Sequence, residues 1–240
     1  MDNINRLNPL LEVLRSSPKR INKIFVQKER GPRRIGEIIR EARAASIPVL
    51  FVPKGKLDQI SPHHQGVMAD VAAKAFSSLD EILAMSGRPF LVILDEVEDP
   101  QNLGAIIRSA AGARADGIIL PERRSAGLTE AVATVSAGAL EHIRVARVPN
   151  LVRAMAELKK RGIWLIGAAG DAAEPWTDFD YTLPIGLVLG SEGHGLRPLV
   201  RETCDKVLAI PLSGRVDSLN VGAAAAVFFF EVVRQRRAVS

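Results

Sequence analysis

Three polar loops hold the residues whose types and spacing suit chemistry, and each follows a run of apolar residues. The loops are Asp95–Arg108, Leu189–Leu196 and Ile210–Val221. Their amide, guanidinium, carboxylate and hydroxyl side chains include Asn102, Arg108, Glu192, Ser218 and Asn220. In an open α/β sheet, ligands bind beyond the carboxyl ends of the parallel strands. The three loops therefore predict one binding site if the sheet brings these strand ends together.

Each loop also has a purely structural interpretation. Asn102 is a good N-cap for the helix that follows it, and Asp217 or Ser218 can cap the last helix. Arg108 is less ordinary, because it lies among apolar helix residues and a buried guanidinium needs an anionic or planar partner. No single loop decides between a structural and a chemical role.

The glycine-rich loop favours a neutral or cationic ligand over a bare phosphate. Gly190, Gly193 and Gly195 let backbone and ligand approach closely, but their order does not match the dinucleotide-binding pattern G-x-G-x-x-G. The carboxylate of Glu192 inside the loop would repel a phosphate. The glycine spacing by itself favours a plain glycine-rich turn at the end of the sheet.

Other reactive residue types lack the neighbours that their chemistry needs. His63 and His64 have no Cys, Asp or Glu cluster to complete a metal set, so we predict no metal site and interpret them as loop or RNA-contacting residues. Cys204 has no nearby histidine and is interpreted as a packing thiol. The sequence contains neither a G-x-S-x-G elbow nor a G-K-[ST] phosphate loop.

The elements that position the three loops follow from the pattern after Pro89. Near-continuous apolar runs predict strands at residues 90–94, 117–120, 143–146, 163–166, 186–189 and 207–210. Helical segments are predicted between them at residues 103–112, 128–140, 151–161 and 219–237. This alternation predicts a parallel sheet with helices on both faces.

The N-terminal residues predict a separate, small α/β unit. Asn8-Pro9 is typical of a capped helix start, and apolar residues at helical spacing predict a second helix at residues 35–45. Strands are predicted at residues 24–26, 48–52 and 67–75. We therefore expect a domain at residues 1–75, a linker at 76–88 and a second domain at 89–240.

The positive charge of the chain is concentrated near its N-terminus. Formal net charge is +5, and residues 1–88 hold 15 Lys and Arg against 9 Asp and Glu. The densest stretch runs from Arg15 to Arg43 and includes Arg30. Such a stripe favours a polyanion through counterion release. A solvated helix face with stabilising charge pairs is the alternative.

Composition is that of an ordinary globular protein, with 47% hydrophobic and 25% charged residues. Glycine and proline are too few for a fibrous or mainly disordered chain. No apolar run reaches the roughly 18 residues of a membrane span, and the N-terminus has no signal-peptide core. The single cysteine cannot form an internal disulfide. We expect a soluble cytoplasmic protein without membrane contact.

Considered together, the three loops resemble, in order and spacing, the signature motifs of the SpoU (TrmH) family of RNA ribose 2′-O-methyltransferases. The matching stretches are DEVEDPQNLGAIIRSA (95–110), LVLGSEGHGLRP (187–198) and IPLSGRVDSLNVGAAAAVFFFE (210–231). NPLLEVLRS (8–16) and HHQGVMA (63–69) resemble the substrate-binding domain of members that methylate a guanosine of 23S rRNA. One departure is Gly222-Ala223-Ala224, where many members have Ser-Val-Ala, and we expect it to alter helix packing rather than chemistry.

The resemblance implies a fold, a cofactor and a set of site residues. The second domain would have the SPOUT α/β fold with a C-terminal trefoil knot, preceded by the small α/β RNA-binding domain. S-adenosylmethionine would be the methyl donor, bound around Gly190, Ile210 and Leu219. The enzyme would be a homodimer with its site near the subunit interface. The family's functional positions match Asn102, Arg108, Glu192, Ser218 and Asn220.

The implied reaction passes a methyl group from a sulfonium to a ribose 2′-hydroxyl, and the family assigns removal of the hydroxyl proton to the arginine matched by Arg108. A guanidinium stays protonated at neutral pH. We therefore hypothesise that Arg108 aligns the hydroxyl and stabilises developing alkoxide charge. In this hypothesis Glu192 and Asn220 orient Arg108 and the substrate, and Glu192 also faces the cationic donor.

Three alternatives remain open from the sequence. The same chemistry on tRNA differs only in substrate, and the extra N-terminal domain favours rRNA by resemblance alone. A non-catalytic RNA-binding assembly protein is disfavoured because Asn102, Arg108, Glu192 and Asn220 are all present. A nucleotide-dependent oxidoreductase is disfavoured by the glycine order and by a cofactor loop so late in the chain.

Overall fold

The computed structural model describes residues 2–28, 33–214 and 216–238. Arg30 of the basic stripe and Arg215 of the third loop lie outside them. The chain forms two compact units, one of Met1–Ala75 with Gly127–His142 and one of Phe76–Ala126 with Ile143–Ser240. The boundaries expected from sequence, at residues 1–75, 76–88 and 89–240, remain our proposal for the functional domains.

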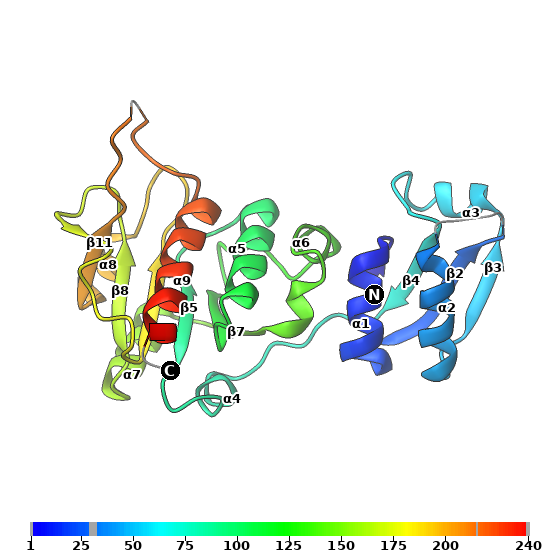
Figure 1. Cartoon of the computed structure of the whole chain (residues 1–240), viewed down its shortest axis with the longest axis horizontal. Coiled ribbons are helices and arrows are strands. Elements are labelled where there is room, and N and C mark those ends of the chain that lie inside the picture. The colour runs from blue at the N-terminus through cyan, green and yellow to red at the C-terminus, as the bar shows by residue number, and fades with distance from the viewer. Residues whose placement is uncertain (1, 29–32, 215, 239–240) are drawn as a thin grey trace. The chain divides into compact units, whose positions relative to one another are not determined.

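The first unit is a four-stranded sheet with two helices packed on it (Figure 1). Its strand order is β1 (Asp2–Ile4), β4 (Val67–Val71), β2 (Ile21–Gln27) and β3 (Val49–Val52). Only β2 and β3 run parallel. The helices are α1 (Leu7–Ser16) and α2 (Arg34–Ala44), and shorter turns of helix are η1 (Pro18–Arg20) and α3 (Lys54–Asp58). Leucines and isoleucines at helical spacing bury one side of each long helix.

The start of α1 differs from the sequence prediction. The helix begins at Leu7, and Asn8 lies inside it rather than capping it. The backbone N–H of Leu7 donates to the side-chain oxygen of Gln65 at 2.9 Å. A side chain 58 residues away thus satisfies a helix-end donor that a local cap normally satisfies.

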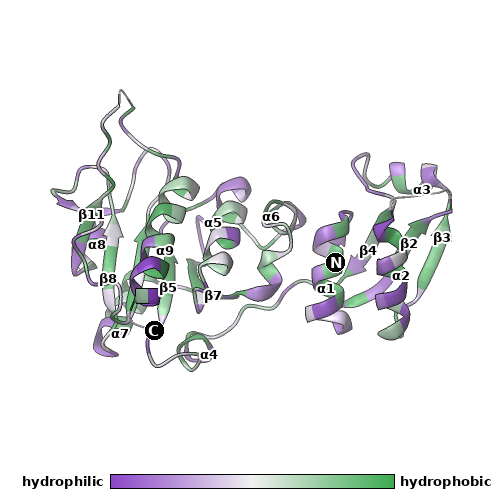
Figure 2. Ribbon diagram, in the orientation of Figure 1, coloured by the Kyte–Doolittle hydropathy of each residue, from purple (hydrophilic) through white to green (hydrophobic). Residues whose placement is uncertain are grey.

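The second unit is built on a seven-stranded sheet in which every neighbouring pair is parallel. Its strand order is β7 (Arg144–Val148), β6 (Gly117–Pro121), β5 (Phe90–Leu94), β10 (Ile185–Leu189), β8 (Trp164–Ala168), β11 (Lys206–Ala209) and β9 (Glu174–Pro175). All residues of β5, β6 and β10 are buried, and the hydrophobic colour of β5 is visible in Figure 2. This agrees with strands that are covered on both faces.

Helices cover both faces of this sheet, as predicted. Successive residues of a strand point to opposite faces. Phe90 packs edge-on against Phe229 of α9 (Val221–Ala238), which lies beside α5 (Pro100–Gly112). The next residue, Leu91, belongs to the core formed with α4 (Leu79–Leu83), α7 (Leu151–Lys160) and α8 (Pro198–Thr203).

Strand β10 lies between β5 and β8, which both precede it in the chain. The segment after β8 therefore returns into the middle of the sheet instead of extending its edge. The loop that follows β10 therefore lies at the centre of the sheet, whereas β11 lies on the far side of β8, one strand from the edge. The trefoil knot implied by the resemblance stays a prediction.

The single helix predicted at residues 128–140 is wrong. The chain forms α6 (Glu130–Val135) and then a 3₁₀ turn, η2 (Ala139–His142). Between them Ala137 and Gly138 have φ values of 53° and 89°. A Cβ on Gly138 would lie 2.5 Å from Cγ of Glu12, so a close approach to α1 interrupts the helical pattern.

Among the residues that the structure describes, no helix combines the length and apolarity needed to cross a membrane.

Candidate functional site

The three predicted loops meet at one edge of the sheet, beyond the carboxyl ends of β5, β10 and β11. β5 and β10 are hydrogen-bonded along their length, and the N–H of Asp95, just after β5, donates to the carbonyl of Leu189 at 2.8 Å. The loop after β11 turns back and leads into α9. The parallel sheet therefore places all three loops at one edge, as the sequence predicted.

Asn220 joins one side chain from each of the other two loops. Its Nδ2 donates to Oδ1 of Asn102 at 2.8 Å and to Oε1 of Glu192 at 2.5 Å. Its Oδ1 accepts the N–H of Gly222 at 2.9 Å and that of Ala223 at 3.3 Å. Because the oxygen caps α9, the amide nitrogen has to point toward the other two side chains.

The structural interpretations of these loops are wrong in their details. Asn220, and neither Asp217 nor Ser218, caps α9. Asp99 caps α5 by accepting the N–H of Gln101 at 3.0 Å, so Asn102 lies within the helix and its side chain is free for other contacts. Because the actual caps lie two or three residues away from the expected ones, both asparagines are left in the site.

Asn102 keeps an unused hydrogen-bond donor. The residue is 6% exposed, and its Oδ1 accepts from Asn220. Its Nδ2 has no hydrogen-bond partner among the residues that the structure describes. Arg147 Nε is the buried side-chain nitrogen or oxygen without a partner in the described part of the chain, so Nδ2 of Asn102 still reaches solvent. A ligand oxygen can replace water as its acceptor.

A cavity of about 420 Å³ lies on one side of this cluster. Its wall includes the three predicted cofactor-binding residues Gly190, Ile210 and Leu219. Ser218, Glu192, Asn220 and Phe228 also line it. Backbone and apolar side chains make up much of the wall, and Glu192 is the acidic residue among those that line it. Such a lining suits a flat, neutral group with a cation near Glu192.

The loop after β10 is folded tightly over this cavity. Ser191 and Gly195 exchange two backbone hydrogen bonds of 3.1 and 3.0 Å, and Gly193 and Gly195 have positive φ. A Cβ on Gly190 would lie 2.1 Å from the carbonyl carbon of Gly195. Glycine at this position is therefore a steric requirement.

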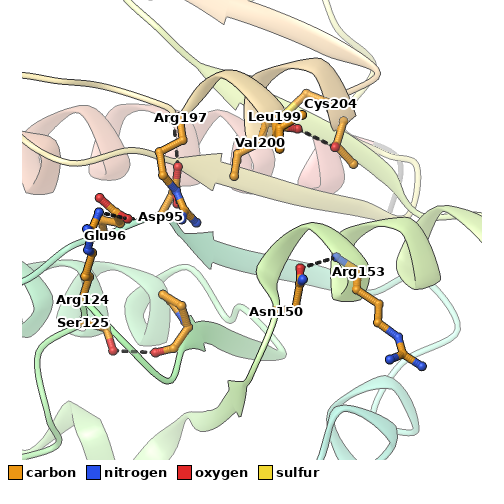
Figure 3. A network of polar contacts seen from close by, with 12 residues as sticks. Asp95, Glu96, Arg124, Ser125, Asn150, Arg153, Arg197, Leu199, Val200 and Cys204 are labelled. Carbon is orange, nitrogen blue, oxygen red and sulfur yellow. Dashed lines mark hydrogen bonds and ion pairs between the residues drawn. The ribbon is translucent and has the colours of Figure 1, made fainter.

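An ion pair fastens the far end of the same loop. Figure 3 shows Asp95 and Arg197 pointing toward each other from the end of β5 and the start of α8. The fully buried carboxylate of Asp95 accepts the backbone N–H of Arg197 at 2.9 Å and its Nε at 2.7 Å. The neighbouring Glu96 pairs with Arg124 at 3.1 Å. The loop that holds Glu192 is thus tied to the first loop at both ends.

Sequence reasoning named Asp95 only as an acidic residue after a strand and missed its partner Arg197. A carboxylate that directly follows five buried residues was the available signal. Nothing local marks Arg197, which is 102 residues away.

A second cavity, of about 360 Å³, adjoins the first at Glu192. It shares Ser191, Glu192 and Val221 with the first cavity, whereas Asn102 lines only the second. Its remaining lining residues are Glu96, Val97, Glu98, Asp99, Arg124 and His194. Two ligand groups placed in the two cavities would meet beside Glu192.

Arg108 is not part of this cluster within the chain. It comes six residues after Asn102, about 240° around the helix axis. Its side chain is exposed and forms no hydrogen bond or ion pair with the residues that the structure describes. The apolar neighbours that suggested burial face the sheet. The structure therefore brings together Asn102, Glu192 and Asn220, and it leaves Arg108 on the surface of α5.

The remaining reactive groups have structural environments. Burial raises the pKa of the Cys204 thiol to about 12, so the thiol is a poor nucleophile. His64 is enclosed in its turn, where Nδ1 accepts the N–H of Gly66 at 2.9 Å and Nε2 lies 2.9 Å from Asp58. Within the described part of the chain, no three His, Cys, Asp or Glu residues are grouped as a metal site requires.

Comparison with known proteins gives two family matches. Residues 89–230 match the SpoU rRNA Methylase family, and residues 7–77 match the RNA 2′-O ribose methyltransferase substrate binding family.

Individual relatives cover almost the whole chain. The chain is 42% identical to the 23S rRNA (guanosine-2′-O-)-methyltransferase RlmB of Haemophilus influenzae, over 98% of both proteins. It is 43% identical to RlmB of Shewanella oneidensis over 94% of both proteins. The SpoU methyltransferase AviRb from Streptomyces viridochromogenes, solved with AdoMet, aligns with a TM-score of 0.84 and 27% identity. That alignment covers 98% of this chain and 90% of AviRb.

Replacing Asp95 by alanine should destabilise the second unit strongly. The change leaves the guanidinium and backbone N–H of Arg197 without their partner, and we expect a loss of about 3 kcal/mol of unfolding free energy. Urea unfolding followed by tryptophan fluorescence measures it, because Trp164 and Trp176 both lie in this unit. Asp171→Ala is the control, since that carboxylate is 72% exposed in its pair with Arg201 and should cost less than about 1 kcal/mol. Equal losses for the two variants would contradict this prediction.

Gly190→Ala should open the loop after β10. The added methyl group meets the backbone of Gly195, which has to move, and we expect a loss of about 2 kcal/mol in the same unfolding measurement. Gly214→Ala provides the control, because nothing lies within 4 Å of a Cβ there. A Gly190→Ala variant as stable as Gly214→Ala would show that the close approach is unimportant.

Proposed function

This chain belongs to the SpoU rRNA methylase family, and we propose that it transfers the methyl group of S-adenosylmethionine to the ribose 2′-hydroxyl of a guanosine in 23S rRNA. The observation that carries the proposal is the junction at Asn220. It holds Asn102 and Glu192 between two cavities, one for each reactant. Because ribosomal RNA is the substrate, we place the enzyme in the cytoplasm.

The first cavity suits the methyl donor. Backbone around Gly190 and the apolar side chains of Ile210 and Leu219 offer a surface for an adenine ring. Glu192 lines both cavities, and its negative carboxylate would attract the cationic sulfonium where the two cavities adjoin. When bound, S-adenosylmethionine supplies an already activated methyl group, so the protein's main task is to position the acceptor.

The second cavity would hold the target nucleotide with its ribose next to Glu192. The unused Nδ2 of Asn102 donates to a ribose oxygen there. Asn220 keeps Asn102 and Glu192 in place, and Ser218 stands at the wall of the donor cavity. These residues orient the hydroxyl in line with the methyl group, which lowers the entropic cost of transfer.

Arg108 would complete the site from a second subunit in a homodimer. It is exposed on α5, and the adjacent helix α9 exposes 52% of Phe230, whose ring lies 3.9 Å from a Cβ built on Gly112. An exposed aromatic ring beside an exposed arginine suits burial against a second copy. There the protonated guanidinium stabilises the negative charge that develops on the 2′-oxygen as its proton passes to water and its bond to the methyl group forms.

The first unit would hold folded RNA by its phosphates. Lys19, Arg40 and Arg43 are exposed and form no ion pair with the described residues, whereas Arg15 pairs with Glu37 at 2.5 Å. Both interpretations of the basic stripe therefore apply, to different side chains. Free surface cations bind a polyanion with strong salt dependence.

The activity can be tested by methyl transfer from labelled S-adenosylmethionine to protein-free 23S rRNA and to bulk tRNA, followed by mapping of the labelled ribose. We expect label at the 2′-oxygen of one guanosine in 23S rRNA. Label on tRNA alone would keep the chemistry and overturn the substrate. Intact donor binding without label on either RNA would favour a ribonucleoprotein substrate or a non-catalytic assembly factor.

Mixed dimers can test whether Arg108 acts across the interface. Arg108→Ala and Glu192→Ala should each lose most activity. If the arginine reaches the partner's site, co-expressing the two variants rebuilds one intact site per mixed dimer and restores about a quarter of wild-type turnover. Each variant alone is the control. Mixed dimers without recovered activity would show that Arg108 serves its own chain.

A further inference from the structure

We propose that the second cavity binds the target guanine base and that Glu98 reads its Watson–Crick edge. This inference rests on the proposed function, because it takes the ribose to lie beside Asn102 and Glu192. It adds a residue that decides which base is accepted.

The acidic lining of the cavity favours a base over a phosphate. Four carboxylates line it, from Glu96, Glu98, Asp99 and Glu192, against the single guanidinium of Arg124. A phosphate would be repelled, whereas a group rich in N–H donors would be attracted. Guanine presents two adjacent donors, N1–H and the 2-amino group, and a carboxylate can accept both at once.

The contacts of the four carboxylates single out Glu98. Glu96 pairs with Arg124 and Arg197, Asp99 caps α5, and Glu192 accepts from Asn220. Glu98 is exposed, and it forms no hydrogen bond or ion pair with any residue that the structure describes. Its carboxylate is therefore free to accept from a ligand.

A separate observation points to a ligand in this cavity. Asn102 is 94% buried and lines only this cavity, and its Nδ2 has no partner among the described residues. This nitrogen is not fully buried, so a ribose oxygen in the cavity can accept from it in place of water. With the ribose at Asn102, the base extends into the remainder of the cavity, where Glu98, Arg124 and His194 lie.

Two more lining residues fit a guanine in this orientation. The exposed ring of His194 offers a face for stacking, which is a common way for proteins to hold an unstacked base. Arg124 is 69% exposed and has donors for the 6-carbonyl oxygen of guanine. Adenine, with an acceptor at N1, and the pyrimidines lack the donor pair that Glu98 would accept.

The test compares guanosine with inosine, which lacks only the 2-amino group. A 23S rRNA fragment that spans the mapped guanosine is assembled with either nucleoside at that position. For the wild-type chain we expect kcat/KM to fall on the order of 10–100-fold with inosine. For Glu98→Gln we expect a similar fall with guanosine and a guanosine-to-inosine ratio near 1.

The matched control is Glu202→Gln, an exposed glutamate on α8 that lines neither cavity. It should keep the wild-type ratio, and all variants should keep the wild-type Kd for S-adenosylmethionine, which also verifies folding. A wild-type ratio in Glu98→Gln would overturn the inference while leaving the proposed function intact. A wild-type chain that binds the donor but methylates no 23S rRNA would overturn both.

Discussion

The architecture of the site depends on the side-chain amide of Asn220, whose hydrogen-bonding groups are all engaged. Its oxygen caps α9, and its nitrogen donates to Asn102 and Glu192. The capping bonds set the direction of the amide, so a structural role for the helix end orients the polar cluster. Only a residue with a donor and an acceptor on one short side chain can do both.

The surrounding structure keeps Glu192 in reach of that amide. Its loop is closed by Gly190 and Gly195, and its far end is tied to β5 by the Asp95–Arg197 pair. A buried carboxylate is costly unless its hydrogen bonds are made, and here a backbone N–H and a guanidinium both donate to it. The Asp95–Arg197 pair therefore forms only when the loop after β10 has the conformation that also holds Glu192 near Asn220.

The two units differ in charge, and this difference matches the separate roles that we propose for them. The excess of Lys and Arg lies within residues 1–88, where phosphate contacts supply affinity without regard to base. The second cavity is acidic, so in the proposed function it would add little affinity for a polyanion and would instead select donors on a base. A base-reading pocket of this kind would require binding energy from elsewhere on the protein, and we propose that the basic residues of the first unit supply it.

Local sequence patterns determined much of this protein. Apolar runs predicted the parallel sheet, and its strand ends correctly predicted where the three loops meet. The helix predicted at residues 128–140 was wrong, because a close contact with Glu12 interrupts it. The predicted N-caps of α5 and α9 were also wrong. Only the tertiary structure decided that Asn220 joins Asn102, 118 residues away, and that two cavities share Glu192. The reason is physical: periodicity reports which face of an element is buried, whereas contacts across the sheet depend on β10 entering between β5 and β8.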